Sequence, residues 1–87
     1  RYTVRRDSDE ACAAESDDLA RDLARHARNA RVQIELLGPI PAFAYRIGGL
    51  YQWQLIVRAL PDDIERLLDA LPAPPGWAVD VDPLSVL

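Results

Sequence analysis

The sequence reads Gly38-Pro39-Ile40-Pro41-Ala42 and then, after a Gly48-Gly49 pair, Tyr51-Gln52-Trp53-Gln54-Leu55. Proline cannot donate a hydrogen bond to a β-ladder, so the first run is expected to interrupt a strand. A Gly-Gly pair is typical of a hairpin turn. The second run alternates between glutamine and apolar side chains, which is the period of a half-buried strand. These stretches predict a hairpin in which Gln52 and Gln54 face away from Trp53 and Leu55.

Before the hairpin, the pattern predicts a short strand from Tyr2 to Arg5, a long helix, and a strand from Val32 to Leu37. Asp7 is the predicted N-cap of the helix, and Glu10 three residues later completes a capping box. The helix is expected to run to about Asn29, with one apolar stripe turned toward the sheet. The stripe consists of Leu19, Ala20, Leu23, Ala24, Ala27 and Ala30.

After Gly48-Gly49, the pattern predicts a long strand from Leu50 to Ala59, a helix that begins at Pro61, and a last strand from Trp77 to Val81. Ala42 to Ile47 is expected to resume the interrupted strand, and Pro83 to stop the last one. The second helix carries an apolar stripe of Ile64, Leu67, Leu68 and Leu71. Leu23 and Leu67 lie in the middle of their stripes and should be central to the core. The strand residues expected beneath the helices are Trp53, Leu55, Val57, Val79 and Val81.

The predicted element order is β-α-β-β-α-β over one domain, residues 1–87. Because both helices have one apolar stripe and the strands alternate, the fold class is α+β: a two-layer sandwich with one sheet face open to solvent. The side chains expected on the open face are polar. They are Gln33, Glu35, Gln52, Gln54 and Arg58. Such a face either docks on a neighbouring domain or is simply solvated.

Composition and charge limit the function. The 87 residues carry a net charge of −4, which argues against strong autonomous binding to nucleic acid. The charge is uneven: residues 7–18 carry −6 and 59–87 carry −5, whereas 32–58 carry +1. No apolar run approaches the ~20 residues of a membrane span, so a soluble, cytoplasmic protein is expected.

Enzymatic chemistry finds no support in the residue pattern. Cys12 and His26 are the only residues of their kinds, and on one helix they would lie about 21 Å apart, too far for a nucleophile and its base. His26 is instead expected to pair with Asp22 on the helix surface. Asp80 and Asp82 share a strand face, but without a third ligand nearby they predict strand-end chemistry rather than a metal site.

The hairpin tip is the better candidate for a binding site. Arg46 precedes the turn, with Phe43, Tyr45 and Tyr51 close by, and a cation among aromatic rings suits phosphate contact and base stacking. Tyr45 and Tyr51 are equally compatible with a purely structural role. The next candidate is the first helix, with Arg21, Arg25 and Arg28, although Asp17 is expected to pair with Arg21.

The run Gly38-Pro39-Ile40-Pro41-Ala42, the strand Tyr51-Gln52-Trp53-Gln54-Leu55 and the terminus Asp80-Val81-Asp82-Pro83, in this order and spacing, resemble the C-terminal domain of bacterial primosomal protein N′ (PriA), a replication-restart helicase family. The resemblance is best from Val32 to Leu87. It implies a fold like that of a small-subunit ribosomal protein. It also implies a non-catalytic module that helps recognise branched DNA at stalled forks, contacts single-stranded-DNA-binding protein and packs against the helicase core.

The same resemblance implies that ATP and zinc are bound elsewhere in a longer parent protein, with no cofactor or metal held by this segment. Relatives are usually rich in arginine at this hairpin; Arg46 matches a basic position, but Gly48, Leu50 and Gln52 occupy positions that are commonly basic. DNA binding by the isolated domain, expected to be a monomer, should therefore be weak and salt-sensitive. The residues expected to contact DNA are Arg46, Tyr45, Tyr51, Gln52 and Arg58.

Two other function classes are compatible with the element order. A small-molecule-sensing regulatory domain shares the β-α-β-β-α-β order, but such domains usually pair as dimers and bind ligands at helix–strand turns. A ribosomal-type RNA-binding protein would need a strongly basic chain, and the isoelectric point of about 4.8 argues against it.

Overall fold

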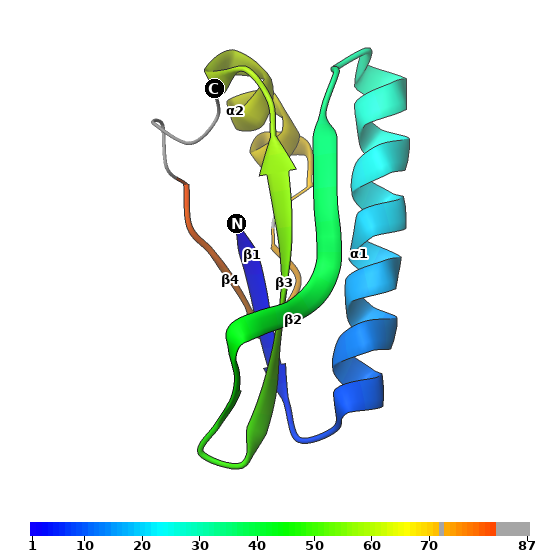
Figure 1. Ribbon diagram of the computed structural model, residues 1–87. Coiled ribbons are helices and arrows are strands. Elements are labelled where there is room, and N and C mark those ends of the chain that lie inside the picture. The colour runs from blue at the N-terminus through cyan, green and yellow to red at the C-terminus, as the bar shows by residue number, and fades with distance from the viewer. Residues whose placement is uncertain (72, 82–87) are drawn as a thin grey trace.

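A computed structural model describes residues 1–71 and 73–81, and all of their side chains except those of residues 43–45 and 47. The described chain forms β1 (Tyr2–Arg6), α1 (Asp9–Ala30), β2 (Glu35–Ile47), β3 (Leu50–Arg58), α2 (Pro61–Ala70) and β4 (Trp77–Val79). Figure 1 shows α1 lying along one side of the sheet, while α2 sits at the end of the sheet opposite the β2–β3 hairpin. The predicted order of elements is confirmed.

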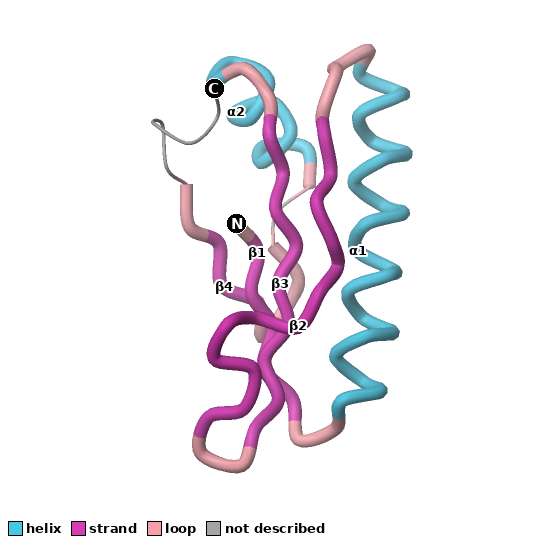
Figure 2. Tube along the Cα trace, viewed as in Figure 1, coloured by secondary structure: helices cyan, strands magenta, loops and turns pink. Residues whose placement is uncertain are grey.

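The sheet has the strand order β2-β3-β1-β4, and every neighbouring pair is antiparallel. This order, with two helices on one face, is the split β-α-β arrangement of a two-layer α+β sandwich. The predicted fold class is therefore confirmed, and Figure 2 shows the long β2–β3 hairpin that dominates it. No helix among the described residues is both long enough and apolar enough to cross a bilayer.

The first helix begins one residue later than predicted. Ser8, not Asp7, is the N-cap: its hydroxyl oxygen accepts a hydrogen bond from the backbone N–H of Ala11, 3.2 Å away. Asp9 and Glu10 then lie in the first turn, where the positive end of the helix dipole favours carboxylates. The capping box predicted from Asp7 and Glu10 is thus wrong, because the serine takes the capping position.

The buried stripe of α1 also starts earlier than predicted. Leu19, Leu23 and Ala27 are buried as expected, but Ala30 is exposed. Cys12 and Ser16 extend the stripe toward the N-terminus, and the Ser16 hydroxyl donates to the carbonyl oxygen of Cys12 at 2.6 Å. This bond satisfies the one buried polar side chain of the stripe, so a serine is tolerated in the core.

The strand β2 differs from the prediction at its start and in its continuity. It begins at Glu35 rather than Val32 and runs through both prolines to Ile47, with register shifts between Leu37 and Ile40 and between Pro41 and Arg46. Proline has no N–H to donate, but β2 is an edge strand with β3 as its one neighbour in the sheet. The prolines therefore do not interrupt hydrogen bonding to a second strand. A Cβ on Gly38 would lie 3.1 Å from the Gln54 carbonyl oxygen, so only glycine allows this close approach at a φ of 97°.

The core lies between the sheet and the two helices. Its buried centre consists of Tyr2, Leu19, Leu23, Leu55 and Leu67, so the predicted roles of Leu23, Leu55 and Leu67 are confirmed. Val57 and Val79 pack against it as expected. Val81 does not: it is 51% exposed, because it follows Asp80, which already pairs with Arg1 at the start of the chain, and no β1 residue lies opposite it. The predicted strand end at Pro83 lies outside the described residues.

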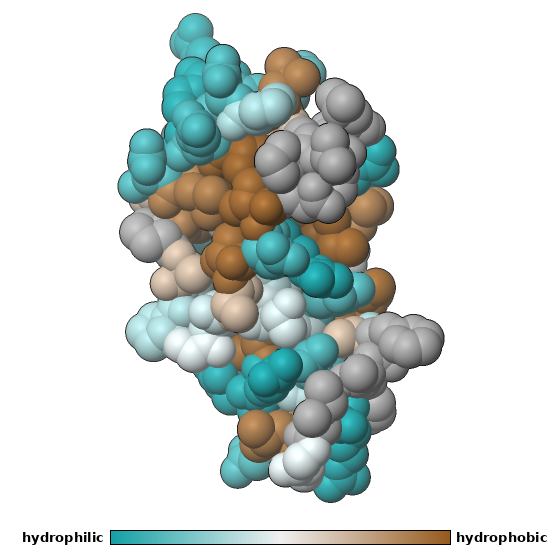
Figure 3. All heavy atoms as spheres, turned by 90° about the vertical axis from the view of Figure 1, so that its left-hand side faces the viewer, coloured by the Kyte–Doolittle hydropathy of each residue, from teal (hydrophilic) through white to brown (hydrophobic). Residues whose placement is uncertain are grey.

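The open sheet face is less polar than predicted. Gln52 and Gln54 lie on it, opposite Arg5 and Thr3 of β1, as the alternation requires. However, Leu37 pairs with Ile56 on this same face, and Leu37 is 39% exposed. Figure 3, which views the side away from α1, shows hydrophobic atoms gathered in its upper half, with hydrophilic atoms around them. Leu37 and Ile56 follow the same alternation as Glu35 and Gln54, so period-two counting already places them on this face. The register shift after Leu37 adds Ile40, which lies opposite Gln54.

Candidate nucleic-acid interface

The tip of the β2–β3 hairpin is an open turn. Gly48 and Gly49 both have positive φ, 58° and 81°, as a tight two-residue hairpin turn requires. A Cβ built on either glycine would meet no atom within 4 Å. The tip therefore projects from the body of the domain (Figure 1) and is sterically free for a large ligand to approach.

Arg46 and Tyr51 form a cross-strand pair at the base of this turn. They are register partners in the β2–β3 ladder, and the Arg46 guanidinium carbon lies 4.7 Å from the centre of the Tyr51 ring. This is cation–π geometry, which stabilises an exposed pair by about 0.5–1 kcal/mol. The Arg46 side chain itself is exposed, so the ring holds the cation at the tip without burying it.

The backbone of Tyr51 is hydrogen-bonded to the first helix. Its carbonyl oxygen accepts a hydrogen bond from the Cys12 thiol, with a sulfur–oxygen distance of 3.4 Å. Burial raises the pKa of this thiol, although the nearby Arg6 backbone and guanidinium act to lower it. The thiol stays protonated at neutral pH and remains a donor. A rigid helix thereby fixes the strand position that carries the ring.

Gln52 points to the other face of the sheet. Its side-chain oxygen accepts a hydrogen bond from Arg5 Nε, and both residues are register partners in the β1–β3 ladder. The structure thus separates Gln52 from the Arg46–Tyr51 pair, although Gln52 directly follows Tyr51 in the sequence. Arg5 was not singled out in the sequence, because its antiparallel register with β3 cannot be deduced from local patterns.

Arg58 lies at the far end of β3. It lies seven positions after Tyr51, or about 23 Å along the strand. Its guanidinium is 3.5 Å from a carboxylate oxygen of Glu35, in a largely exposed pair. Arg58 and Arg46 are therefore not parts of one compact site. The side chains of Tyr45 and Phe43 lie outside the described residues.

The arginine series on α1 is largely matched by neighbouring carboxylates. Arg21 pairs with Asp18, not with the predicted Asp17, and Arg25 pairs with Asp22, which was expected to pair with His26. Both pairs are spaced three residues apart on the helix surface. These carboxylates offset the positive charge, so this face is a poorer place for a phosphate than the hairpin tip.

Metal-ligating side chains are not grouped together in the described part of the chain. Among the residues that the structure describes, no group of three or more histidine, cysteine, aspartate or glutamate side chains is placed to hold a metal ion. Asp80 accepts from Arg1 instead, with 3.2 Å between Nη2 and Oδ2. Asp82, the second carboxylate considered for a cation, lies outside the described residues.

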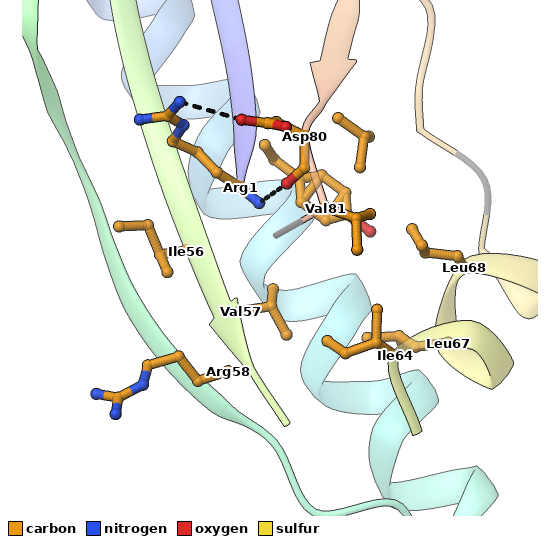
Figure 4. Close-up of a pocket in the computed structure, with 11 residues that line it drawn as sticks. Arg1, Ile56, Val57, Arg58, Ile64, Leu67, Leu68, Asp80 and Val81 are labelled. Atoms are coloured by element: carbon orange, nitrogen blue, oxygen red, sulfur yellow. Dashed lines mark hydrogen bonds and ion pairs between the residues drawn. The ribbon is translucent and has the colours of Figure 1, made fainter. Parts of the chain in front are cut away.

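An apolar pocket at the opposite end of the sheet was not predicted. It has a volume of about 270 Å³ and lies between the end of β3, the start of β1, the end of β4 and α2. Figure 4 shows Ile56 and Val57 of β3 and Ile64, Leu67 and Leu68 of α2 around it, with the Arg1–Asp80 pair on its rim. Tyr2 also lines it, and burial raises the pKa of its hydroxyl.

Comparison with known proteins supports one family. The sequence pattern of the family described as "Primosomal protein N C-terminal domain" matches residues 2–84. The chain is similar to the replication restart protein PriA of Synechocystis sp. (strain ATCC 27184 / PCC 6803 / Kazusa), with 40% identity over 60 residues. That match covers 61% of this chain and 7% of the PriA protein, so the chain corresponds to a small part of that relative. No solved structure matches the chain.

Proposed function

We propose that this chain, which belongs to the family of primosomal protein N C-terminal domains, is a non-catalytic DNA-contacting module of a replication-restart factor. The name of the Synechocystis relative supports a role in replication restart. The function of the module is to help position a larger protein on branched DNA at stalled forks. ATP hydrolysis and zinc binding belong, in this proposal, to other parts of that protein.

The observation that carries the proposal is the Arg46 guanidinium held over the Tyr51 ring at an open Gly48–Gly49 turn. A guanidinium presents several N–H donors that suit the oxygens of a phosphate, and stacking on an aromatic ring leaves those donors available at its edge. Tyr51 contributes by positioning Arg46. The DNA contact is therefore assigned first to Arg46, with Tyr45 and Tyr51 as neighbouring aromatic residues.

The expected affinity is low. One arginine neutralises about one phosphate, and the chain as a whole carries −4, so binding falls in the non-specific range of about 10⁻⁴ M or weaker at physiological salt. Within a longer protein, tethering raises the effective concentration of such a module to roughly millimolar. A weak contact then suffices to bias orientation on the fork.

Partner contacts form the second half of the proposal. The open sheet face, with exposed Leu37 and Ile40 beside polar Gln52 and Gln54, suits docking against another domain of the same polypeptide. Contact with single-stranded-DNA-binding protein is proposed from family membership. The isolated module is proposed to be a cytoplasmic monomer.

Fluorescence anisotropy with a labelled fork at low salt tests the DNA contact. Arg46→Ala should weaken binding about three- to tenfold, the effect of losing one exposed charged contact, while lowering the free energy of unfolding by no more than about 1 kcal/mol, the contribution of an exposed cation–π pair. Arg25→Ala is the matched control, because it removes the same charge from a salt-bridged position on α1. If both variants bind alike, the hairpin tip is not the contact.

A further inference from the structure

A second cleft lies at the end of the domain opposite the hairpin tip. Its volume is about 460 Å³, and it is bounded by the end of α1, the start of β2, the end of β3 and the first turns of α2. Arginines from three of these elements line it: Arg31, Arg58 and Arg66. Arg31 is far from the other two in sequence, and the three meet because α1 and β3 end, and α2 begins, at this edge of the fold.

The cleft has a surplus of positive charge in a chain that is acidic overall. Three guanidinium groups and two carboxylates, Glu35 and Asp63, line it. Arg66 pairs closely with Asp63, whereas Arg58 and Glu35 are 3.5 Å apart, with side chains 43% and 60% exposed, so that pair is weak. The Arg31 side chain forms no ion pair within the described part of the chain.

Arg31 is held in an unusual backbone conformation. It is the C-cap of α1 with a φ of 57° and a ψ of 40°, a left-handed geometry in which glycine is the common residue. Its backbone N–H donates to the carbonyls of Ala27 and Arg28, and Val32 N–H donates to Ala27, so the position is well fixed. An arginine here is kept at a conformational cost, while the fixed backbone directs where its side chain starts.

We infer that this cleft is a second anion site of the domain, in which Arg31 meets a phosphate group of the DNA backbone while Arg66, paired with Asp63, adds positive charge to the lining. The Arg31 guanidinium presents several N–H donors to the oxygens of a phosphate, and arginine binds such groups with paired hydrogen bonds. Arg58 adds positive charge from β3. The inference deepens the proposed function and rests on it for the source of the phosphate.

The position of the cleft gives the inference a geometric consequence. It lies at the Arg58 end of β3, about 23 Å along the strand from Tyr51. Two weak contacts separated by this distance would engage phosphates at separate places on one DNA molecule. Each should add about one to the number of counterions released on binding.

The test uses the 87-residue chain, a labelled DNA fork and a series of salt concentrations. Arg31→Gly should weaken binding about three- to tenfold and lower the slope of log K against log salt by about one. Arg66→Gln, which removes a guanidinium already paired with Asp63, should weaken binding by about two- to threefold. Arg31→Gly should have a thermal midpoint no lower than that of the parent chain, because glycine prefers the left-handed conformation. Arg21→Gln, which removes a charge from a salt-bridged position outside the cleft, should change binding less than about twofold.

The outcomes separate this inference from the hairpin contact. If Arg46→Ala weakens binding and the two cleft variants match Arg21→Gln, the cleft inference fails and the hairpin contact stands. If only the cleft variants weaken binding, the cleft stands and the hairpin proposal fails. Inorganic phosphate is the second probe: if it perturbs the Arg31 side-chain NMR signal while DNA does not, the cleft takes free phosphate and the inferred DNA contact is wrong.

Discussion

The indole N–H of Trp53 donates a hydrogen bond to a carboxylate oxygen of Asp9, 2.8 Å away. The bond joins the middle of β3 to the first turn of α1, forty-four positions earlier in the chain. It satisfies the one polar atom of a half-buried indole, and it keeps a carboxylate at the positive end of the helix. The largest aromatic side chain of the hairpin therefore fixes the helix to the sheet and takes no part in the tip.

Removing this bond should destabilise the domain. Trp53→Phe is expected to lower the free energy of unfolding by about 1–2 kcal/mol, because it deletes a hydrogen bond to a charged group along with some buried area. Asp9→Asn, Trp53→Phe and the double variant form a cycle measured by urea unfolding. Strict additivity of the two single changes would show that the pair is not coupled.

Truncation of the core should be far more costly. Leu67 is 4% exposed and lies in the central cluster, so Leu67→Ala should cost about 2–5 kcal/mol, a large share of the stability of a small domain. Leu60→Ala provides the control, since Leu60 is 64% exposed and its truncation should cost less than about 0.5 kcal/mol. Equal midpoints for the two variants in thermal unfolding would remove Leu67 from the core.

The turn before β4 brings Gly76 close to the end of the Arg6 side chain. A Cβ there would lie 2.7 Å from Arg6 Nη1, and Arg6 binds both carboxylate oxygens of Glu15 at 2.7 Å. Gly76→Ala should therefore cost more than Gly48→Ala, which shares a positive φ but meets nothing within 4 Å. We expect about 1 kcal/mol for Gly48→Ala from the backbone alone and up to about 1 kcal/mol more for Gly76→Ala, because the Arg6 guanidinium must shift within its pair with Glu15. Calorimetric midpoints that agree for both variants would contradict the Arg6 contact.

The buried thiol predicts how stability changes at alkaline pH. Burial raises the pKa of Cys12 in the folded chain, so the unfolded chain loses the thiol proton first as pH rises. This contribution to stability is fully present below about pH 8.5, the ordinary cysteine pKa, and is lost as pH rises through the higher folded-state value. Urea unfolding between pH 8 and about pH 9.5, before the ordinary tyrosine range, should show a decline of at most about 1.4 kcal/mol per pH unit. Cys12→Ala should lower stability at every pH but flatten this decline, and an unchanged slope would argue against the thiol as its cause.

The sequence predicted what depends on local periodicity. Alternation in β3 placed Gln52 and Gln54 on the face of the sheet that Leu55 does not occupy, and helical spacing placed Leu23 and Leu67 in the core. The N-cap was missed because Asp7 and Ser8 are both good capping residues, and only the observed bond between Ser8 and Ala11 distinguishes them.

What the sequence missed depends on contacts between distant residues. The exposure of Val81 follows from where the pairing of β1 and β4 ends, which no local pattern encodes. The apolar side chain of Leu37, in contrast, follows the alternation of Glu35 and could have been placed on the open face from the sequence. The cleft of Arg31, Arg58 and Arg66 requires three chain segments to meet. For the hairpin, the sequence indicated that Arg46 and Tyr51 would be near each other, and the ladder register then paired them directly.

The proposed DNA contact depends on Arg46, which is held over the Tyr51 ring. Arginine Nε–Hε signals in ¹H–¹⁵N NMR spectra report on each guanidinium separately, so a titration of the 87-residue chain with an unlabelled DNA fork at low salt tests it most directly. We predict that the Arg46 signal shifts progressively as fork is added, that added salt reverses the shift, and that the signals of the salt-bridged Arg21 and Arg25 stay near their starting positions. An Arg46 signal that stays in place while the fork binds would contradict the account.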